Sequence, residues 1–124
     1  QDISINRKIK IINKNIDLSK ILHKYDLCLI SGGFVKFELM CVGVPIIYIP
    51  LNAHQKQLSK KFSDIGHGIF LSEIKKLVSN KTQLKNKITS IINNFENRKK
   101  MYIRNRNLVD GRAFKRLNKI FNSL

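Results

Sequence analysis

Two apolar runs, joined by a glycine turn and a helix-length segment, constrain the fold of this chain more than any other feature. The stretch from residue 26 to residue 55 reads DLCLISGGFVKFELMCVGVPIIYIPLNAHQ. The first run ends in Ser-Gly-Gly at 31–33, and Gly-Val-Pro at 43–45 leads into the second run. Glycines let backbone N–H groups approach an anion, and a helix N-terminus adds a favourable dipole. The pattern therefore predicts a strand–turn–helix–strand unit whose turn can hold a phosphate.

The rest of the hydrophobic pattern extends this alternation along the chain. Strands are predicted at 8–12, 27–30, 46–49 and 68–71, with the second and third buried on both faces, and helices are predicted at 17–25, 34–42 and 54–65. From residue 72 onward the pattern is helical, with helices expected at 72–79, 82–95, 98–107 and 113–121. Alternating strands and helices imply a parallel sheet that is covered on both faces and binds ligands at the carboxyl ends of its strands. We therefore expect a Rossmann-like α/β fold with a sheet portion at 1–71 and a helical portion at 72–124.

Residues 1–124 are expected to form a single partial domain. The length suffices for a sizeable core, but a complete doubly wound domain normally has one or two further strand–helix units before those predicted here. Gln1 is not an initiator methionine, and no leader pattern follows it. No apolar run approaches the length that crosses a bilayer, so no transmembrane segment is expected. We interpret the chain as a piece of a longer protein.

The positions of Cys and His indicate a reduced, cytoplasmic setting. Cys28 and Cys41 lie in apolar segments and are interpreted as small core residues. His23, His54 and His67 share no metal-ligand spacing with either cysteine. We therefore expect no metal and no cofactor.

The chain carries a formal net charge of +16, from 24 Lys and Arg against 8 Asp and Glu. Residues 54–124 hold 17 of the basic residues and 4 of the acidic ones. Such a surface can bind nucleic acid or another anionic partner. However, 18 of the 24 basic residues are Lys in a chain also rich in Ile and Asn, a bias typical of an AT-rich genome. The aromatic residues follow the apolar periodicity and do not alternate with the basic ones, so no nucleic acid is expected.

The segment DLCLISGGFVKFELMCVGVP resembles the C-terminal, nucleotide-sugar-binding half of GT-B enzymes. The likeness is to the group that contains the UDP-sugar hydrolase of pseudaminic acid biosynthesis and spore-coat polysaccharide biosynthesis proteins, and more distantly the lipid II N-acetylglucosaminyltransferase. Residues 52–55 (NAHQ) resemble the Asn-Gln loop of the hydrolase and spore-coat side, and LVDGR at 108–112 with Arg116 resembles its closing segment. The resemblance implies a GT-B C-terminal domain whose first strand–helix units and partner N-terminal domain lie upstream.

The resemblance also implies a site for UDP or a UDP-sugar. The glycine turn would cradle the diphosphate, and Glu38 would accept hydrogen bonds from the ribose hydroxyls through its two oxygens. Gln55, with His54, would reach the sugar or the β-phosphate; the hydrolase group has Asn-Gln where this chain has His-Gln. The expected substrate-binding residues are Ser31, Gly32, Gly33, Phe34, Glu38, His54 and Gln55.

The implied function is that of the nucleotide-sugar-binding part of a bacterial surface-sugar biosynthesis enzyme. The first hypothesis is a hydrolase that cleaves a UDP-amino sugar, as in a pseudaminic acid type pathway, and the alternative is a GT-B glycosyltransferase that uses a UDP-sugar donor. Because the resembled hydrolase takes its catalytic base from the N-terminal domain, no catalytic residue is assigned here and the chain alone is expected to be inactive. A non-catalytic basic module, binding nucleic acid or an acidic partner through the helices after Glu73, is a second alternative.

Overall fold

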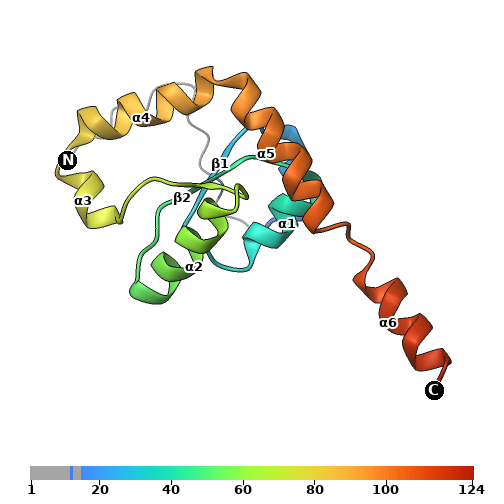
Figure 1. The fold of residues 1–124 in the computed structure, drawn as a ribbon. Helices are drawn as coiled ribbons and strands as arrows, with labels where there is room; N and C mark the ends of the chain where they lie inside the picture. The colour runs from blue at the N-terminus through green and yellow to red at the C-terminus, as the bar shows by residue number, and fades with distance from the viewer. Residues whose placement is uncertain (1–11, 13–14) are drawn as a thin grey trace.

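The computed structural model describes Ile12 and residues 15–124 and contains a three-stranded parallel sheet (Figure 1). Strands β1 (Cys28–Ile30), β2 (Ile46–Tyr48) and β3 (Ile69–Phe70) pair in the order β1-β2-β3. Helix α1 (Val35–Val42) connects the first two strands, and α2 (Ala53–Asp64) connects the second to the third. The Rossmann-like α/β class is therefore confirmed. The predicted strand at 8–12 lies outside the described residues except for Ile12.

The central strand β2 divides the hydrophobic core into two clusters. Ile46 and Tyr48 are fully buried among residues of α1 and α2 on one face of the sheet. Ile47 points to the other face, where it packs with residues of α3 (Ile74–Val78) and α4 (Lys81–Asn93). Because side chains alternate along a strand, a wholly apolar β2 needs a helical layer on each face. The described helices supply both layers.

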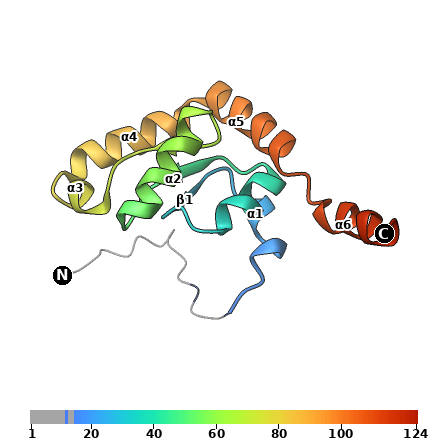
Figure 2. The ribbon, with the colours of Figure 1, turned by 60° about the horizontal axis from the view of Figure 1, so that its bottom comes forward.

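The helical portion is tied to the sheet by α5 (Phe95–Leu108), which packs along α1. Met101 on α5 is 3% exposed, and its sulfur accepts a hydrogen bond from the Ile46 N–H at 3.2 Å. The α4–α5 boundary falls at Asn94, whose side chain caps α5 by accepting from the Asn97 N–H. After α5, helix α6 (Ala113–Asn122) extends away from the rest of the molecule (Figure 2).

Two predictions about the start of the sheet portion are wrong. The helix expected at 17–25 is a pair of 3₁₀ turns, η1 (Leu18–Lys20) and η2 (Leu22–Lys24), the first of which is capped by the Asp17 side chain. Only Leu22 is buried in these turns, so they lack the continuous apolar face that stabilises a longer α-helix. Leu29 in β1 is 45% exposed, because β1 ends the described sheet and α3 and α4 pack with residues nearer β2 and β3.

In the described part of the chain, no helix combines the length and the apolar character that a membrane span requires.

Candidate functional site

Two loops meet at the carboxyl edge of the sheet and line an open cavity of about 510 Å³. One loop follows β1 and leads into α1, and the other follows β2 and leads into α2. Adjacent parallel strands end at the same edge, which brings loops that are about 20 residues apart in sequence together. The cavity is lined by Gly32, Gly33, Phe34 and Lys36 from the first loop and helix, and by Asn52, Ala53, His54, Gln55 and Leu58 from the second.

The two glycines of the first loop serve different purposes. Gly32 adopts φ +104°, and a Cβ at this position would lie 2.5 Å from the Oγ of Ser59 on α2. This position therefore requires glycine both for its backbone conformation and for the close approach of α2. A Cβ at Gly33 would meet no atom within 4 Å. The turn is thus tightly packed at its first glycine and open at its second.

The backbone beyond these glycines offers hydrogen-bond donors to a ligand. The N–H groups of Gly33, Phe34 and Val35 have no acceptor among the described residues, and no side chain caps the start of α1. Unpaired N–H groups at a helix start bind anions because they combine direct donation with the positive end of the helix dipole. This loop can accordingly hold a phosphate.

Lys36 is a residue of this site that the sequence analysis missed. It is 5% exposed, and its Nζ donates to the carbonyl oxygens of Gly32 at 3.0 Å and Gly33 at 3.3 Å. The ammonium also lies 4.7 Å from the ring centroid of Phe37 and 5.3 Å from that of Phe62. Desolvation lowers the pKa of this ammonium from its usual value. The available signal was a single lysine inside the apolar run FVKFELM, directly after the glycine pair.

The second loop is shaped by its own side chains. Asn52 caps α2 by accepting from the Gln55 N–H at 2.9 Å. The Gln55 side-chain oxygen accepts from the Leu51 N–H at 3.0 Å, which holds the loop against the start of the helix. His54 is exposed at the helix start. The resemblance to an Asn-Gln loop thus falls on residues that build the entrance to α2.

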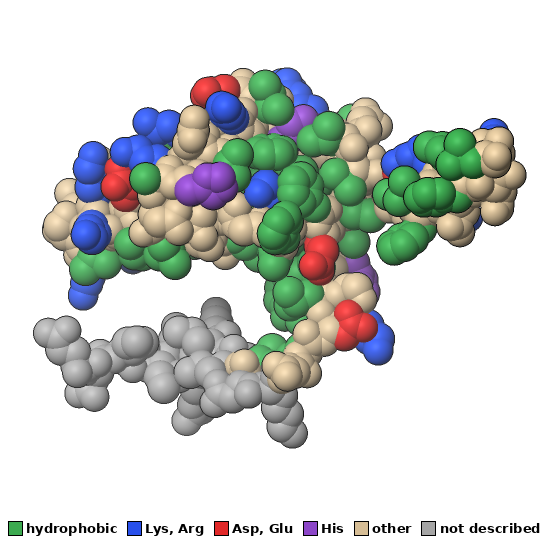
Figure 3. All heavy atoms as spheres, turned by 90° about the horizontal axis from the view of Figure 1, so that it is seen from below, with side chains coloured by type: hydrophobic (Ala, Val, Ile, Leu, Met, Phe, Trp, Pro, Cys, Tyr) green, Lys and Arg blue, Asp and Glu red, His purple; other side chains and the backbone are tan. Residues whose placement is uncertain are grey.

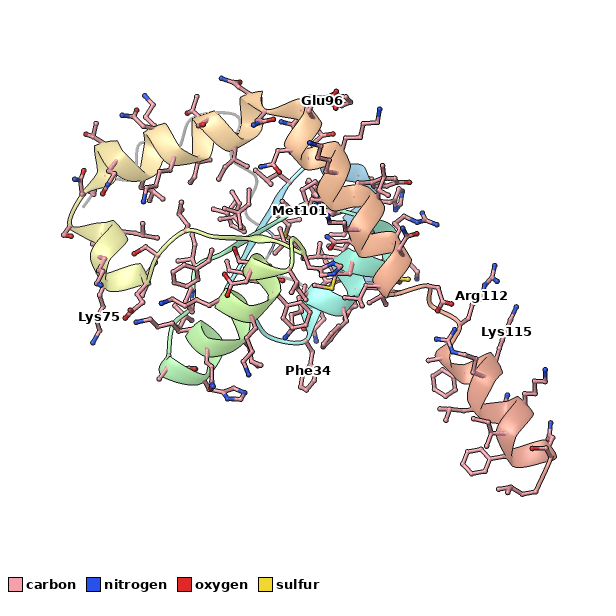
Figure 4. The ribbon with its side chains drawn as sticks, viewed as in Figure 1. Phe34, Lys75, Glu96, Met101, Arg112 and Lys115 are labelled. Atoms are coloured by element: carbon pink, nitrogen blue, oxygen red, sulfur yellow. The ribbon has the colours of Figure 1, made fainter. Side chains whose placement is uncertain are left out.

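The structure brings together most of the expected substrate-binding residues. Gly32, Gly33, Phe34, His54 and Gln55 all line the cavity. The Phe34 side chain, 87% exposed, projects outward from the loop (Figure 4).

The other two expected residues lie beside the cavity. Ser31 is half-buried at the end of β1, immediately before the glycines. Glu38 is exposed on α1, about one turn beyond the helix start, and is not among the lining residues.

A smaller cavity of about 300 Å³ lies between the segment that enters β2 and helix α5. It is lined by residues including Val44, Pro45, Arg98 and Tyr102. Pro45 directly precedes β2, so this cavity lies at the amino end of that strand, whereas open parallel sheets bind ligands at the carboxyl ends. Within the described residues, no group of three or more His, Cys, Asp or Glu side chains is arranged to hold a metal ion.

One curated protein shows a sequence similarity that bears on this site. Over 115 residues, or 93% of this chain, the sequence is 28% identical to the spore coat polysaccharide biosynthesis protein SpsG of Bacillus subtilis (strain 168). The similarity is distant and partial. The chain spans 33% of the length of SpsG. No protein-family model and no solved structure matches the chain.

The similarity to SpsG supports, in its coarse form, the expectation drawn from the sequence. It relates the chain to a protein of polysaccharide biosynthesis, on the spore-coat side of the resembled group. Because the alignment covers 93% of the chain, it includes the glycine turn, α1 and α2, and not only the basic helices.

Proposed function

We propose that this chain is the nucleotide-sugar-binding part of an enzyme of bacterial surface-sugar biosynthesis, and that its ligand is UDP or a UDP-sugar. The observation that carries the proposal is the cavity of about 510 Å³ at the carboxyl edge of the sheet, which is lined both by the loop with the unpaired N–H groups after Gly32 and by the start of α2. A pocket of this size, with one end suited to anions, fits a nucleotide diphosphate better than a small metabolite. The distant similarity to SpsG supports the surface-sugar context.

In this proposal each part of the ligand has its own partner. The diphosphate lies against the N–H groups of Gly33 and Phe34 at the start of α1. Glu38, one helical turn further on, accepts from the two ribose hydroxyls through its paired oxygens. His54 and Gln55 face the sugar from the start of α2. The start of α1 stabilises the negative charge that grows on the diphosphate as the sugar bond breaks.

The first reaction class is hydrolysis of a UDP-amino sugar by water, with the catalytic base supplied by another domain of the protein. The alternative is transfer of the sugar to an acceptor hydroxyl, which a GT-B transferase catalyses with the same donor site. Incubating the full-length protein with a UDP-amino sugar distinguishes the two. Release of UDP in water alone indicates the hydrolase, and release that requires an added acceptor indicates the transferase.

A basic nucleic-acid module is the alternative from a different class. Its motivation is the excess of positive charge after residue 54. Figure 3 shows Lys and Arg side chains scattered over one face of the molecule and not gathered in one groove. A nucleic-acid site needs a continuous basic path along the phosphate backbone, and the face shown offers none.

The decisive experiment is a calorimetric titration of UDP into the full-length protein, with CMP and GMP as controls. We expect selective binding of UDP that Glu38→Ala abolishes. The matched control is Glu96→Ala, which removes another exposed carboxylate near the start of a helix, on the opposite side of the molecule from Phe34 of the cavity (Figure 4). Equal binding of all three nucleotides, or salt-sensitive binding of generic RNA that survives Glu38→Ala, would overturn the proposal.

A further inference from the structure

We propose that Lys36 is a positioning residue of the diphosphate site, which holds the Gly32–Gly33 turn so that its N–H groups are presented to the ligand. The inference rests on the proposed function, since it assigns a role within the same site. Three observations carry it: the hydrogen bonds of the ammonium, the orientation of the peptide groups that it holds, and the absence of a carboxylate partner among the described residues.

The Lys36 ammonium is attached to two successive peptide groups. It donates to the carbonyl oxygens of Gly32 and Gly33, at 3.0 and 3.3 Å, from the first turn of α1. The Gly33 carbonyl also accepts from the Lys36 backbone N–H at 3.3 Å. One residue therefore fixes the turn through its side chain and its backbone together, and its aliphatic stem is buried while it does so.

The direction of these bonds determines where the N–H groups point. In a trans peptide the C=O and the N–H of the same unit point in opposite directions. The carbonyls of Gly32 and Gly33 point toward the ammonium, so the N–H groups of Gly33 and Phe34 point away from it. These are two of the N–H groups without an acceptor among the described residues. Lys36 thus orients the loop so that the N–H groups of Gly33 and Phe34 are directed away from the ammonium and are free to donate to a ligand.

The charge of Lys36 strengthens the same N–H groups. A cation that donates a hydrogen bond to a carbonyl oxygen polarises that peptide unit and makes the N–H of the same unit a stronger donor. A low-dielectric surrounding increases this effect. The surroundings here are two aromatic rings and the glycine turn. A buried charge is costly unless an opposite charge compensates it, and none of the ion pairs among the described residues includes Lys36. A bound diphosphate would supply that opposite charge.

The test compares uridine, UDP and inorganic pyrophosphate as calorimetric probes on the full-length protein. Lys36→Met keeps the length of the side chain but removes the charge and the donors, whereas Lys36→Arg keeps both. Lys61→Met, at an exposed position on α2, is the matched control for losing one positive charge. The ratio of UDP to uridine affinity isolates the diphosphate, since both ligands carry the same nucleoside.

We expect Lys36→Met to lower the UDP-to-uridine ratio and the pyrophosphate affinity by roughly 10- to 100-fold, the size of a lost charge-assisted interaction, with uridine affinity unchanged. Lys36→Arg should restore most of the ratio, and Lys61→Met should behave as wild type. A Lys36→Met protein that keeps the ratio, or loses uridine and UDP affinity equally, overturns the inference. Pyrophosphate binding that depends on Lys36 but is accompanied by no selectivity for UDP supports the inference for an anion site and overturns the proposed function.

Discussion

At the scale of the residue, the two glycines of the cavity make opposite demands on a substitution. Gly32 combines a positive φ with a neighbour, the Ser59 hydroxyl, that would lie 2.5 Å from any Cβ. Gly33 has neither constraint from the protein, since a Cβ there meets open space. The first glycine is required by folding, whereas the second leaves the turn open for a ligand.

This difference can be measured by replacing each glycine with alanine. Gly32→Ala should lower the free energy of unfolding by about 1–3 kcal/mol, because alanine is strained at positive φ and must also displace Ser59. Gly33→Ala should stay within about 1 kcal/mol of wild type. Urea unfolding of both variants provides the measurement. Equal losses for the two variants would contradict the different roles assigned to them.

The residue scale is also where the sequence was least informative. The glycine turn could be recognised because strand–glycine–helix is a local pattern, and the 52–55 loop because it follows the next strand. The contacts of Lys36 could not be recognised from the sequence, because a lysine in a helix is usually solvated. Nothing in the local sequence shows that its ammonium donates to the carbonyl oxygens of Gly32 and Gly33. Its burial results from the aromatic side chain of Phe62, which α2 contributes from 26 positions further along the chain.

At the scale of the element, α5 holds the helical portion to the sheet. Met101 is buried against β2 and accepts the Ile46 N–H, so its side chain both fills the core and satisfies a backbone donor. The hydrophobic period of the sequence predicted that α5 is a helix, but not which helix it packs against. That partner, α1, is set by tertiary contacts between segments some 60 residues apart.

Substitutions at Met101 separate its two contributions. Met101→Ala should cost about 2–5 kcal/mol of unfolding free energy through the cavity it leaves. Met101→Leu keeps the volume but leaves the Ile46 N–H without its acceptor, which should cost about 1–3 kcal/mol. Thermal and urea denaturation measure both. A leucine variant as stable as wild type would show that the sulfur contributes only its volume.

The segment between α5 and α6 is held by hydrogen bonds and an ion pair of Asp110. Asp110 accepts from the Arg116 guanidinium at 2.7 and 3.1 Å and from the Arg112 N–H at 3.0 Å, and these contacts, the first above all, lower the pKa of its carboxyl to about 2. A carboxylate with a lowered pKa contributes its full stabilisation above the usual value of 3.8 and loses it as the pH falls toward 2.

Amide exchange should report this window. We expect protection of the Arg112 amide to persist down to about pH 4 and to fall between 4 and 2. Asp110→Asn keeps an acceptor oxygen for the Arg112 N–H but loses the charged partner of Arg116. In this variant the protection of the Arg112 amide should therefore not change between pH 4 and pH 2. Hydrogen exchange followed by NMR makes the comparison. Identical pH profiles for the two proteins would exclude the ion pair as the cause.

At the scale of the whole molecule, none of the described residues outside α6 covers its apolar face. Phe114, Leu117 and Phe121 are 82, 47 and 66% exposed, and hydrophobic side chains gather along the projecting helix (Figure 3). Their spacing places them on one side of the helix, with Lys115 and Lys119 on the other. An apolar face of this size is usually covered by another surface in solution.

Residues 1–124, when produced as a separate polypeptide, should therefore self-associate. Replacing Leu117 and Phe121 with serine should raise the monomer fraction in sedimentation, with Lys115→Ser and Lys119→Ser together as the matched control on the opposite side of the helix. If the double serine variant leaves the sedimentation profile unchanged, some surface other than α6, such as an edge of the described sheet, mediates the association.

The contact between α5 and α1 has a consequence for the order in which a ribosome completes this protein. Each described strand pairs with a described strand one helix away in sequence, so this part of the sheet can form as soon as residue 71 has emerged. Helix α1 receives its outer partner only after α5 has been synthesised, and the Met101–Ile46 bond closes a loop of 55 residues. Until then the nascent chain exposes the face of α1 that packs on α5, on the helix whose first turn lines the cavity. The last third of the sequence, which holds α5, therefore completes the packing of α1 only after the residues of the sheet have been synthesised.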